Sequence, residues 1–100
     1  MLSLPEAREI AAAYLKGIEP ELGLELVLLD ESTVDEPFGW LFFYNSRSFV
    51  ETGNFSDCLV GNAPLLISRA DGSLHITGTA FPVEYYVANF LATGDPHRSR

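Results

Sequence analysis

The feature that most constrains the fold is a short, continuous run of apolar and aromatic residues, Gly39-Trp40-Leu41-Phe42-Phe43-Tyr44-Asn45. A run of this length and composition is typical of a central strand that is covered on both faces. Successive side chains of a strand point to opposite faces. Trp40, Phe42 and Tyr44 should therefore share one face, and Leu41 and Phe43 the other.

Two amphipathic helices are predicted at the ends of the chain. Ser3-Leu4-Pro5-Glu6 reads as a capping box, and apolar residues then recur at helical spacing as far as Ile18. We expect this helix to end at Gly17 or at the Glu19-Pro20 step. The second helix should begin at Pro82 and end at Gly94, because proline favours the first helical position and glycine the end.

The residues between the helices predict an antiparallel sheet. Besides 39–45, strands are expected at 24–30, 64–68 and 73–77, with a hairpin turn at 69–72. The acidic stretch 30–37 reads as a strand end plus loop, because Pro37 argues against a central strand. We therefore expect an α+β fold in the order helix, four-stranded mainly antiparallel sheet, helix, with both helices on one face. One domain should span 1–94, followed by a flexible tail at 95–100.

With both helices on one face, the other face of the central strand needs a cover. Three candidates stay open: the segment 46–63, a second copy of the chain, or a partner. Segment 46–63 combines loop-forming residues with apolar ones, and Ser56-Asp57 could cap a helical turn that runs to Val60. Long connections that keep their own apolar residues are usually packed down and often functional.

Charge is distributed unevenly along the chain. Residues 1–36 contain nine acids and two bases, a net charge of −7, whereas 37–100 contain five acids and four bases. This balance repels phosphate backbones, so no nucleic-acid partner is expected. It would attract a basic partner, or it serves only to keep the protein in solution. No apolar run reaches membrane-spanning length, no signal peptide is evident and there is a single cysteine, which together favour the cytoplasm.

No residue set predicts catalysis, a metal or a cofactor. Cys58 follows Asp57, an anion that opposes formation of a thiolate beside it. His75 is expected to be a structural histidine that bonds the backbone at 78–79. The acids of 30–36 lack the order of a calcium loop, and no phosphate loop is present. An enzyme would need Cys58, His75 and a carboxylate in one pocket.

Three motifs in order resemble the immunity protein 35 family, which includes the YrhB-type proteins. The motifs are Phe38 to Ser46, Gly61-Asn62-Ala63-Pro64, and His75 to Ala80 followed by Pro82, Glu84 and Tyr85. The resemblance extends from the first helix to about Leu91. It implies an α+β immunity protein of a bacterial polymorphic-toxin system, which binds and neutralises a cognate toxin and is not an enzyme. The alternative that it implies is a chaperone-like holding protein of the YrhB type.

On this hypothesis the partner is a protein toxin that is basic where it makes contact, and a homodimer stays open. Apolar anchors and acidic side chains would form the contact surface. The residues expected to bind the partner are Glu36, Trp40, Phe49, Glu51, Phe55 and Asp57.

Overall fold

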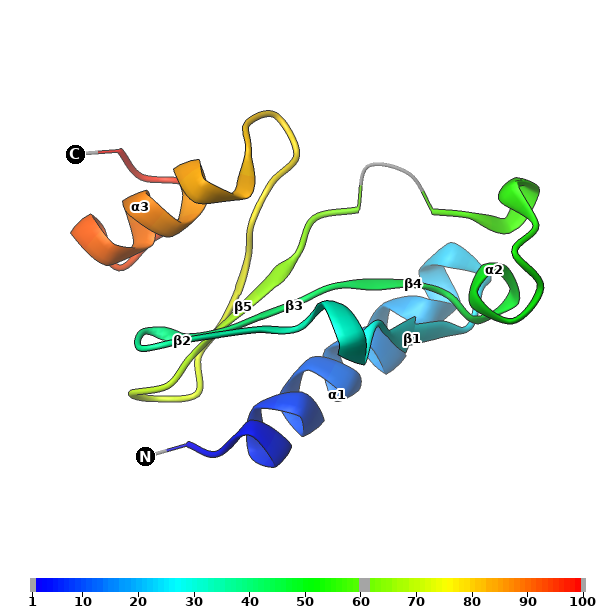
Figure 1. The fold of residues 1–100 in the computed structure, drawn as a ribbon, viewed down its shortest axis with the longest axis horizontal. Helices are drawn as coiled ribbons and strands as arrows, with labels where there is room; N and C mark the ends of the chain where they lie inside the picture. The colour runs from blue at the N-terminus through cyan, green and yellow to red at the C-terminus, as the bar shows by residue number, and fades with distance from the viewer. Residues whose placement is uncertain (1, 60–61, 100) are drawn as a thin grey trace.

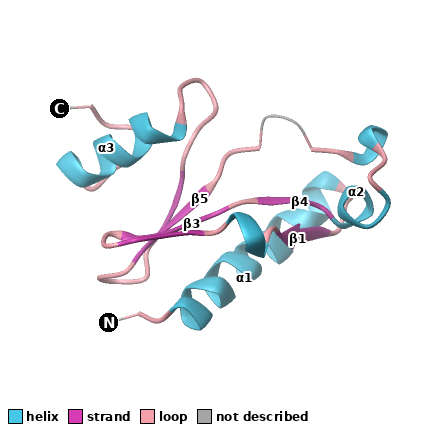
Figure 2. Ribbon diagram, in the orientation of Figure 1, coloured by secondary structure: helices cyan, strands magenta, loops and turns pink. Residues whose placement is uncertain are grey.

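The computed structural model describes residues 2–59 and 62–99, and it confirms the α+β class (Figure 1). The helices are α1 (Leu4–Leu22), α2 (Arg47–Thr52) and α3 (Val83–Thr93). The strands are β1 (Leu26–Leu28), β2 (Val34–Glu36), β3 (Gly39–Phe42), β4 (Tyr44–Ser46), β5 (Leu65–Ser68) and β6 (Leu74–Ile76). Two short 3-10 helices, η1 (Asp30–Ser32) and η2 (Phe55–Asp57), complete the described elements, and Figure 2 shows where helix, strand and loop alternate.

The strands form two antiparallel sheets instead of one. The main sheet has the order β2-β3-β5-β6, and β1 pairs with β4 in a separate two-stranded sheet. Antiparallel pairing is confirmed, but the expected single sheet is wrong, because the strand predicted at 24–30 joins the smaller one. The acidic stretch contributes β2, an edge strand that ends before Pro37.

The predicted central strand divides at Phe43. Its first part, β3, pairs with β2 and β5, whereas its second part, β4, pairs with β1. The Phe43 carbonyl oxygen accepts a hydrogen bond from the Leu29 amide at 2.8 Å, so the chain is already bonded to the smaller sheet at this residue. One apolar run therefore links the two sheets.

Helix α1 begins at the predicted capping box. The Glu6 carboxylate accepts from the Ser3 amide at 3.0 Å, and the Ser3 hydroxyl accepts from the Glu6 amide at 3.4 Å. The predicted end at Gly17 or at Glu19-Pro20 is wrong, because the helix continues to Leu22 and ends at Gly23. Pro20 lies in the last turn, where its missing N–H removes a single helical hydrogen bond.

The core lies between α1 and one face of the sheets. Ala7, Ala11 and Leu15 of α1 are buried against this face. The strands contribute Leu26, Trp40, Phe42, Leu65 and Ile67 to the same cluster. Trp40 and Phe42 thus share a face, as the alternation predicts.

Helix α3 covers the opposite face, so the expectation that both helices lie on one face is wrong. Figure 1 shows α1 and α3 on either side of β3 and β5. The Phe90 ring of α3 lies 6.1 Å from Phe38 and 5.1 Å from His75, measured between ring centroids. Leu41 and Leu66 point away from the α1 cluster and are buried as well. Each inner strand therefore has apolar residues on both faces, and α3 covers the second.

The residues after α3 lie against β6. Pro96 is buried, and its carbonyl oxygen accepts a hydrogen bond from the Asn89 side chain at 2.9 Å. The His97 ring nitrogen Nε2 is 2.7 Å from the Ile76 carbonyl oxygen, an acceptor, so this nitrogen donates. The domain boundary at 94 and the flexibility of 95–100 stay predictions.

Candidate functional site

Residues 46–59 form a compact lobe at the end of the molecule remote from α3 (Figure 1). We call this segment the α2–η2 lobe. Helix α2 was not predicted, although both of its boundary residues are typical ones. Ser46 caps its start, and Gly53, with a φ of 71°, ends it by donating its N–H to the Phe49 carbonyl oxygen. The helical turn that Ser56-Asp57 was expected to cap is wrong, because η2 spans Phe55–Asp57, Asn54 caps it, and Cys58 and Leu59 are not helical. The expected end of that turn, Val60, lies outside the described residues.

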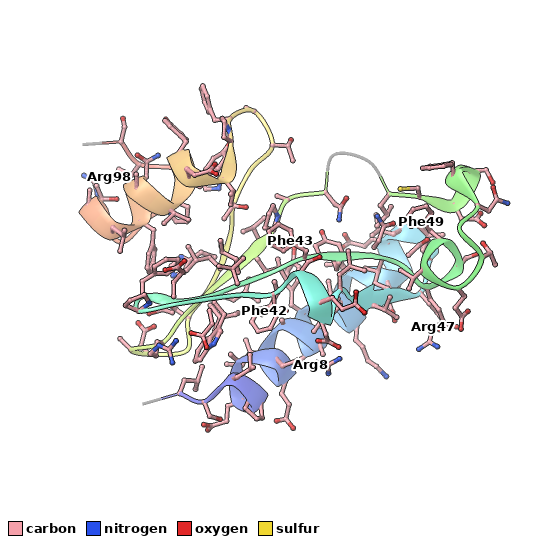
Figure 3. The ribbon with its side chains drawn as sticks, viewed as in Figure 1. Arg8, Phe42, Phe43, Arg47, Phe49 and Arg98 are labelled. Carbon is pink, nitrogen blue, oxygen red and sulfur yellow. The ribbon has the colours of Figure 1, made fainter. Side chains whose placement is uncertain are left out.

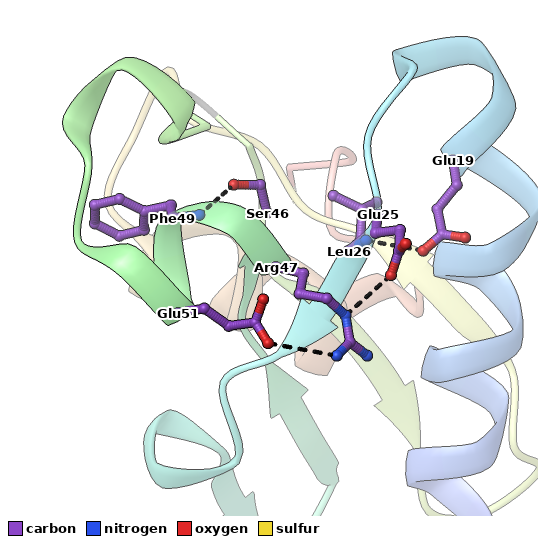
Figure 4. Close-up of polar contacts among 7 residues, drawn as sticks. All are labelled: Glu19, Glu25, Leu26, Ser46, Arg47, Phe49 and Glu51. Atoms are coloured by element: carbon purple, nitrogen blue, oxygen red, sulfur yellow. Dashed lines mark hydrogen bonds and ion pairs between the residues drawn. The ribbon is translucent and has the colours of Figure 1, made fainter.

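Ser46 fixes the lobe to β4. Its side chain is fully buried, and its hydroxyl donates to the Asp57 carbonyl oxygen at 2.5 Å. The same hydroxyl accepts from the Phe49 amide at 3.0 Å (Figure 4). One side chain therefore holds both the start of α2 and the end of η2.

Asn45 provides a second attachment. Its carbonyl oxygen Oδ1 accepts from the amides of Ser46 and Leu59, each at 2.8 Å. Its Nδ2 donates to the Leu59 carbonyl oxygen at 3.4 Å and lies 3.6 Å from the Cys58 sulfur. Leu59, at the end of the lobe, is thus hydrogen-bonded to β4, the strand that precedes the lobe.

The lobe exposes apolar side chains. Phe55 is 83% exposed, more than any other large hydrophobic residue among those described, and Val50 is 47% exposed. The Phe55 ring contacts that of Phe49, with 5.7 Å between centroids (Figure 3 labels Phe49). Asn54 holds the turn that carries Phe55 by accepting from the Ser56 amide at 3.1 Å. Exposed apolar groups that are held in place in this way are typical of interaction surfaces.

Acidic side chains border these apolar groups. Arg47 pairs with Glu25 at 3.0 Å and with Glu51 at 3.8 Å (Figure 4). The Asp57 carboxylate accepts from the Ser48 hydroxyl at 2.8 Å. Arg47 thus pairs with two of the three carboxylates, and Asp57 forms no ion pair with a described residue.

Of the six residues expected to bind the partner, four lie together in the lobe: Phe49, Glu51, Phe55 and Asp57. The other two lie elsewhere. Trp40 is a core residue, 1% exposed, with the Arg69 guanidinium 4.2 Å from its ring centroid. Glu36 is exposed at the end of β2 and lines a groove beside α3. The lobe is therefore the candidate site, and burial removes Trp40 from this surface.

The acidic stretch 30–36 is partly neutralised within the chain. Arg8 donates two hydrogen bonds to the Asp30 carboxylate, at 2.8 and 2.9 Å, and this contact lowers the pKa of Asp30. Arg69 pairs with Asp35 at 2.5 Å. Glu31 and Glu36 are left to contribute free negative charge to this side of the molecule.

Cys58 and His75, the two side chains that an enzyme would need together, form hydrogen bonds with different neighbours. The Cys58 thiol donates to the Leu59 carbonyl oxygen at 3.4 Å. His75 does not make the expected bond to the backbone at 78–79, because its Nε2 bonds the Ser73 hydroxyl at 2.9 Å. Across residues 2–59 and 62–99, no three side chains of the metal-binding types cluster together. Within the same ranges, no helix combines the length and apolarity needed to cross a bilayer.

The fold and the lobe define a small α+β protein that holds an exposed aromatic side chain on a hydrogen-bonded projection. The family model described as immunity protein 35 matches residues 5–92. The chain therefore belongs to the immunity protein 35 family, as the three sequence motifs predict.

A curated relative is the uncharacterized protein YrhB of Escherichia coli (strain K12). It is 42% identical to this chain over 52 residues, which cover 52% of this chain and 55% of the relative. The match thus spans about half of each protein. No solved structure gives a significant match.

Proposed function

We propose that this chain is an immunity protein that binds and neutralises a cognate toxin of a polymorphic-toxin system through its α2–η2 lobe. Membership of the immunity protein 35 family supports the class of function. The observation that carries the choice of surface is Phe55, an 83% exposed aromatic side chain on a segment that hydrogen bonds hold to β4.

The lobe is suited to binding because it is already ordered. Ser46 and Asn45 fix its path in the free protein, so a partner that binds it does not have to order a loop. Phe49 supports the Phe55 ring from one side and leaves most of that ring accessible. An aromatic side chain that a partner buries at the centre of an interface commonly contributes a large share of the binding free energy.

The acidic surroundings favour a basic partner. Glu25, Glu51 and Asp57 lie at the lobe, and Arg47 is the one base among residues 46–59. Carboxylates at the border of an apolar contact accelerate encounter with a cationic surface more than they raise final affinity. Neutralisation would follow when the lobe covers the active or target-binding surface of the toxin inside the producing cell.

The test is co-expression with the toxin encoded beside this gene, scored by growth. The wild-type chain should restore growth, and Phe55→Ser should lose protection because it removes the anchor. Phe81→Ser is the matched control, since Phe81 is also an exposed phenylalanine but lies outside the lobe. Failure of the wild-type chain to protect, with no complex formed, would reject the function. Equal loss with both variants would reject the surface.

A chaperone-like holding protein is the second candidate. The observation that favours it is the presence of exposed apolar side chains outside the lobe as well, including Phe81 and Leu91. A holding protein should suppress aggregation of several unrelated clients, whereas an immunity protein should act on one toxin. Absence of protection for every client tested would eliminate this candidate.

A further inference from the structure

The main sheet is wider than the helix that covers its second face. Neighbouring strands lie about 4.8 Å apart, so the four strands extend beyond a single helix, which is about 10 Å across. Strand pairing aligns one row of side chains across this face: Val34, Leu41, Leu66 and His75. Phe90 of α3 contacts His75, at the β6 end of the row. The β2 end of the row therefore lies beside the helix and not beneath it.

An apolar groove of about 570 Å³, which we call the α3 groove, borders this end of the row. Val34 and Leu41 line it from the sheet. Residues four positions apart on α3 form its other wall: Val83, Val87 and Leu91. Leu91 is 63% exposed, so the wall is open to solvent at this point. An apolar hollow of this kind is suited to apolar side chains of another molecule.

Two carboxylates line the α3 groove, one toward each end. Glu84 is in the first turn of α3. Glu36 ends β2, next to the turn whose Phe38 ring contacts Phe90. Phe90 comes six residues after Glu84, a rise of about 9 Å along the helix. Both acids are exposed, and neither forms an ion pair with a described residue.

The bases near the α3 groove do not neutralise these acids. Arg69 donates to the Glu36 carbonyl oxygen at 2.8 Å, but its guanidinium lies over Trp40, on the opposite face of the sheet. Arg98 follows the last turn of α3, where its carbonyl oxygen accepts from the Thr93 hydroxyl, and it does not line the groove. No lysine or arginine within the described ranges lines it. The groove is therefore complementary to a cationic ligand, and two copies that met here would repel each other.

We propose that the α3 groove docks an apolar segment of a partner protein that has a lysine or arginine at each end. The apolar side chains of this segment cover Val87 and Leu91, and its two bases pair with Glu36 and Glu84. About two helical turns span the distance between the acids. The α2–η2 lobe lies at the opposite end of the molecule, so both surfaces can be occupied at once (Figure 1). The inference goes beyond the proposed function and is tested without a toxin.

A pair of labelled peptides tests the proposal by fluorescence anisotropy. The first is a helix-forming peptide of about ten residues, with leucines along one face and a lysine at each end of that face. The second has glutamates in place of both lysines. The purified chain should bind the lysine peptide at least tenfold more tightly, a difference of about 1.4 kcal/mol. Absence of binding by the lysine peptide, or equal binding of the two peptides, would overturn the proposal.

A charge reversal tests the role of the two acids. The double variant Glu36→Lys, Glu84→Lys should bind the glutamate peptide more tightly than the lysine peptide. The control is Glu9→Lys, Glu21→Lys, which changes the net charge equally at two exposed positions of α1. This control should keep the wild-type preference. A preference that reverses in both double variants would show that total charge decides it, and would overturn the assignment of the site.

A leucine substitution tests the apolar wall. Leu91→Asn should weaken binding of the lysine peptide at least tenfold, and circular dichroism of this variant should match the wild type because Leu91 is largely exposed. Leu22→Asn is the matched control, since Leu22 is an exposed leucine at the end of α1. Equal binding by both variants would overturn the site. Sedimentation equilibrium of the free chain tests the rival occupant, because a dimer that Leu91→Asn abolishes would assign the groove to a second copy and overturn the proposal.

Discussion

The Ser46 hydroxyl and the Asp57 carbonyl oxygen, which are eleven positions apart in sequence, are joined by a hydrogen bond of 2.5 Å. The same hydroxyl caps α2 by accepting from the Phe49 amide. The conformation of the lobe therefore depends on a fully buried side chain that has no exposure to a partner. Its effect on binding must be indirect, through the position of Phe55.

Ser46→Ala should lower the free energy of unfolding by about 1–2 kcal/mol, since it removes a helix cap and leaves the Asp57 carbonyl without its partner. Amide hydrogen exchange should accelerate in 47–57 more than in α1. Ser32→Ala is the control, because the Ser32 hydroxyl is exposed and makes no side-chain hydrogen bond to a described residue. Uniform acceleration across the chain would contradict a local role for Ser46.

Gly39→Ala should be strongly destabilising. A Cβ at this position would overlap the Ile67 carbonyl oxygen on β5, and the φ of 149° is rarely adopted by other residues. Gly17→Ala is the matched control, because a Cβ there meets no described atom within 4 Å. Because position 17 lies in the interior of α1, Gly17→Ala should raise the free energy of unfolding by about 0.5–1 kcal/mol. Thermal unfolding of both variants measures the contrast, and equal effects would contradict the close approach of β3 and β5.

Arg69→Ala should change the environment of Trp40, the only tryptophan of the chain. The guanidinium lies 4.2 Å from the ring centroid and also donates to the Glu36 carbonyl oxygen at 2.8 Å. Without it water reaches the ring, so the emission maximum should move to longer wavelength. The loss of stability should be about 1 kcal/mol. Arg8→Ala, which removes an arginine that makes no contact with Trp40, should leave the emission unchanged.

Acidification should remove the contribution of the Arg8–Asp30 pair. The hydrogen bonds from Arg8 hold the pKa of Asp30 below its usual value. A carboxylate whose pKa is lowered in the folded state stabilises the fold at pH values above its unfolded-state pKa of about 3.9. This stability is lost as the pH falls through the folded-state pKa. At pH 7 the free energy of unfolding of the wild type should exceed that of Asp30→Asn by less than about 1 kcal/mol, because the pair is exposed.

Urea unfolding at neutral and acidic pH measures this difference, which should vanish at the acidic end. Glu31→Gln is the control, since Glu31 is an exposed neighbour that forms no ion pair within the described ranges. A difference between wild type and Asp30→Asn that stays constant with pH would contradict a role for the ionised carboxylate.

If the lobe binds a basic toxin, Glu51→Lys should slow association and weaken its dependence on salt, because steering depends on the sign of the charge near the contact. Glu9→Lys changes the net charge equally but lies on α1, outside the lobe. Stopped-flow association at several salt concentrations compares the two variants. A similar slowing by both would show that total charge matters and that the lobe does not.

Local signals in the sequence predict much of the fold. The Ser3–Glu6 box starts α1, and Gly94 ends α3 with a φ of 84°. Gly72, with a φ of 72°, lies in the hairpin turn between β5 and β6. Each of these features depends on residues a few positions apart, so the sequence displays it directly.

The parts that were not predicted depend on distant contacts. The division at Phe43 requires β1 to pair with β4, and no sequence signal near Phe43 predicts that pairing. The place of α3 depends on which face is left after α1 has packed. Both Trp40 and Phe55 read as aromatic anchors, yet one is 1% and the other 83% exposed. Tertiary packing decides that difference, and propensity does not.

The division at Phe43 also separates the projecting lobe from the main sheet. The lobe leaves from β4 in the two-stranded sheet, whereas Trp40 and Phe42 of β3 and Leu65 and Ile67 of β5 pack in the core on the main sheet. Replacement of the exposed side chains at 50, 51 and 55 therefore leaves the packing of Trp40, Phe42 and Ile67 intact. Such a scaffold can carry different contact surfaces on its projecting end over the same packed core.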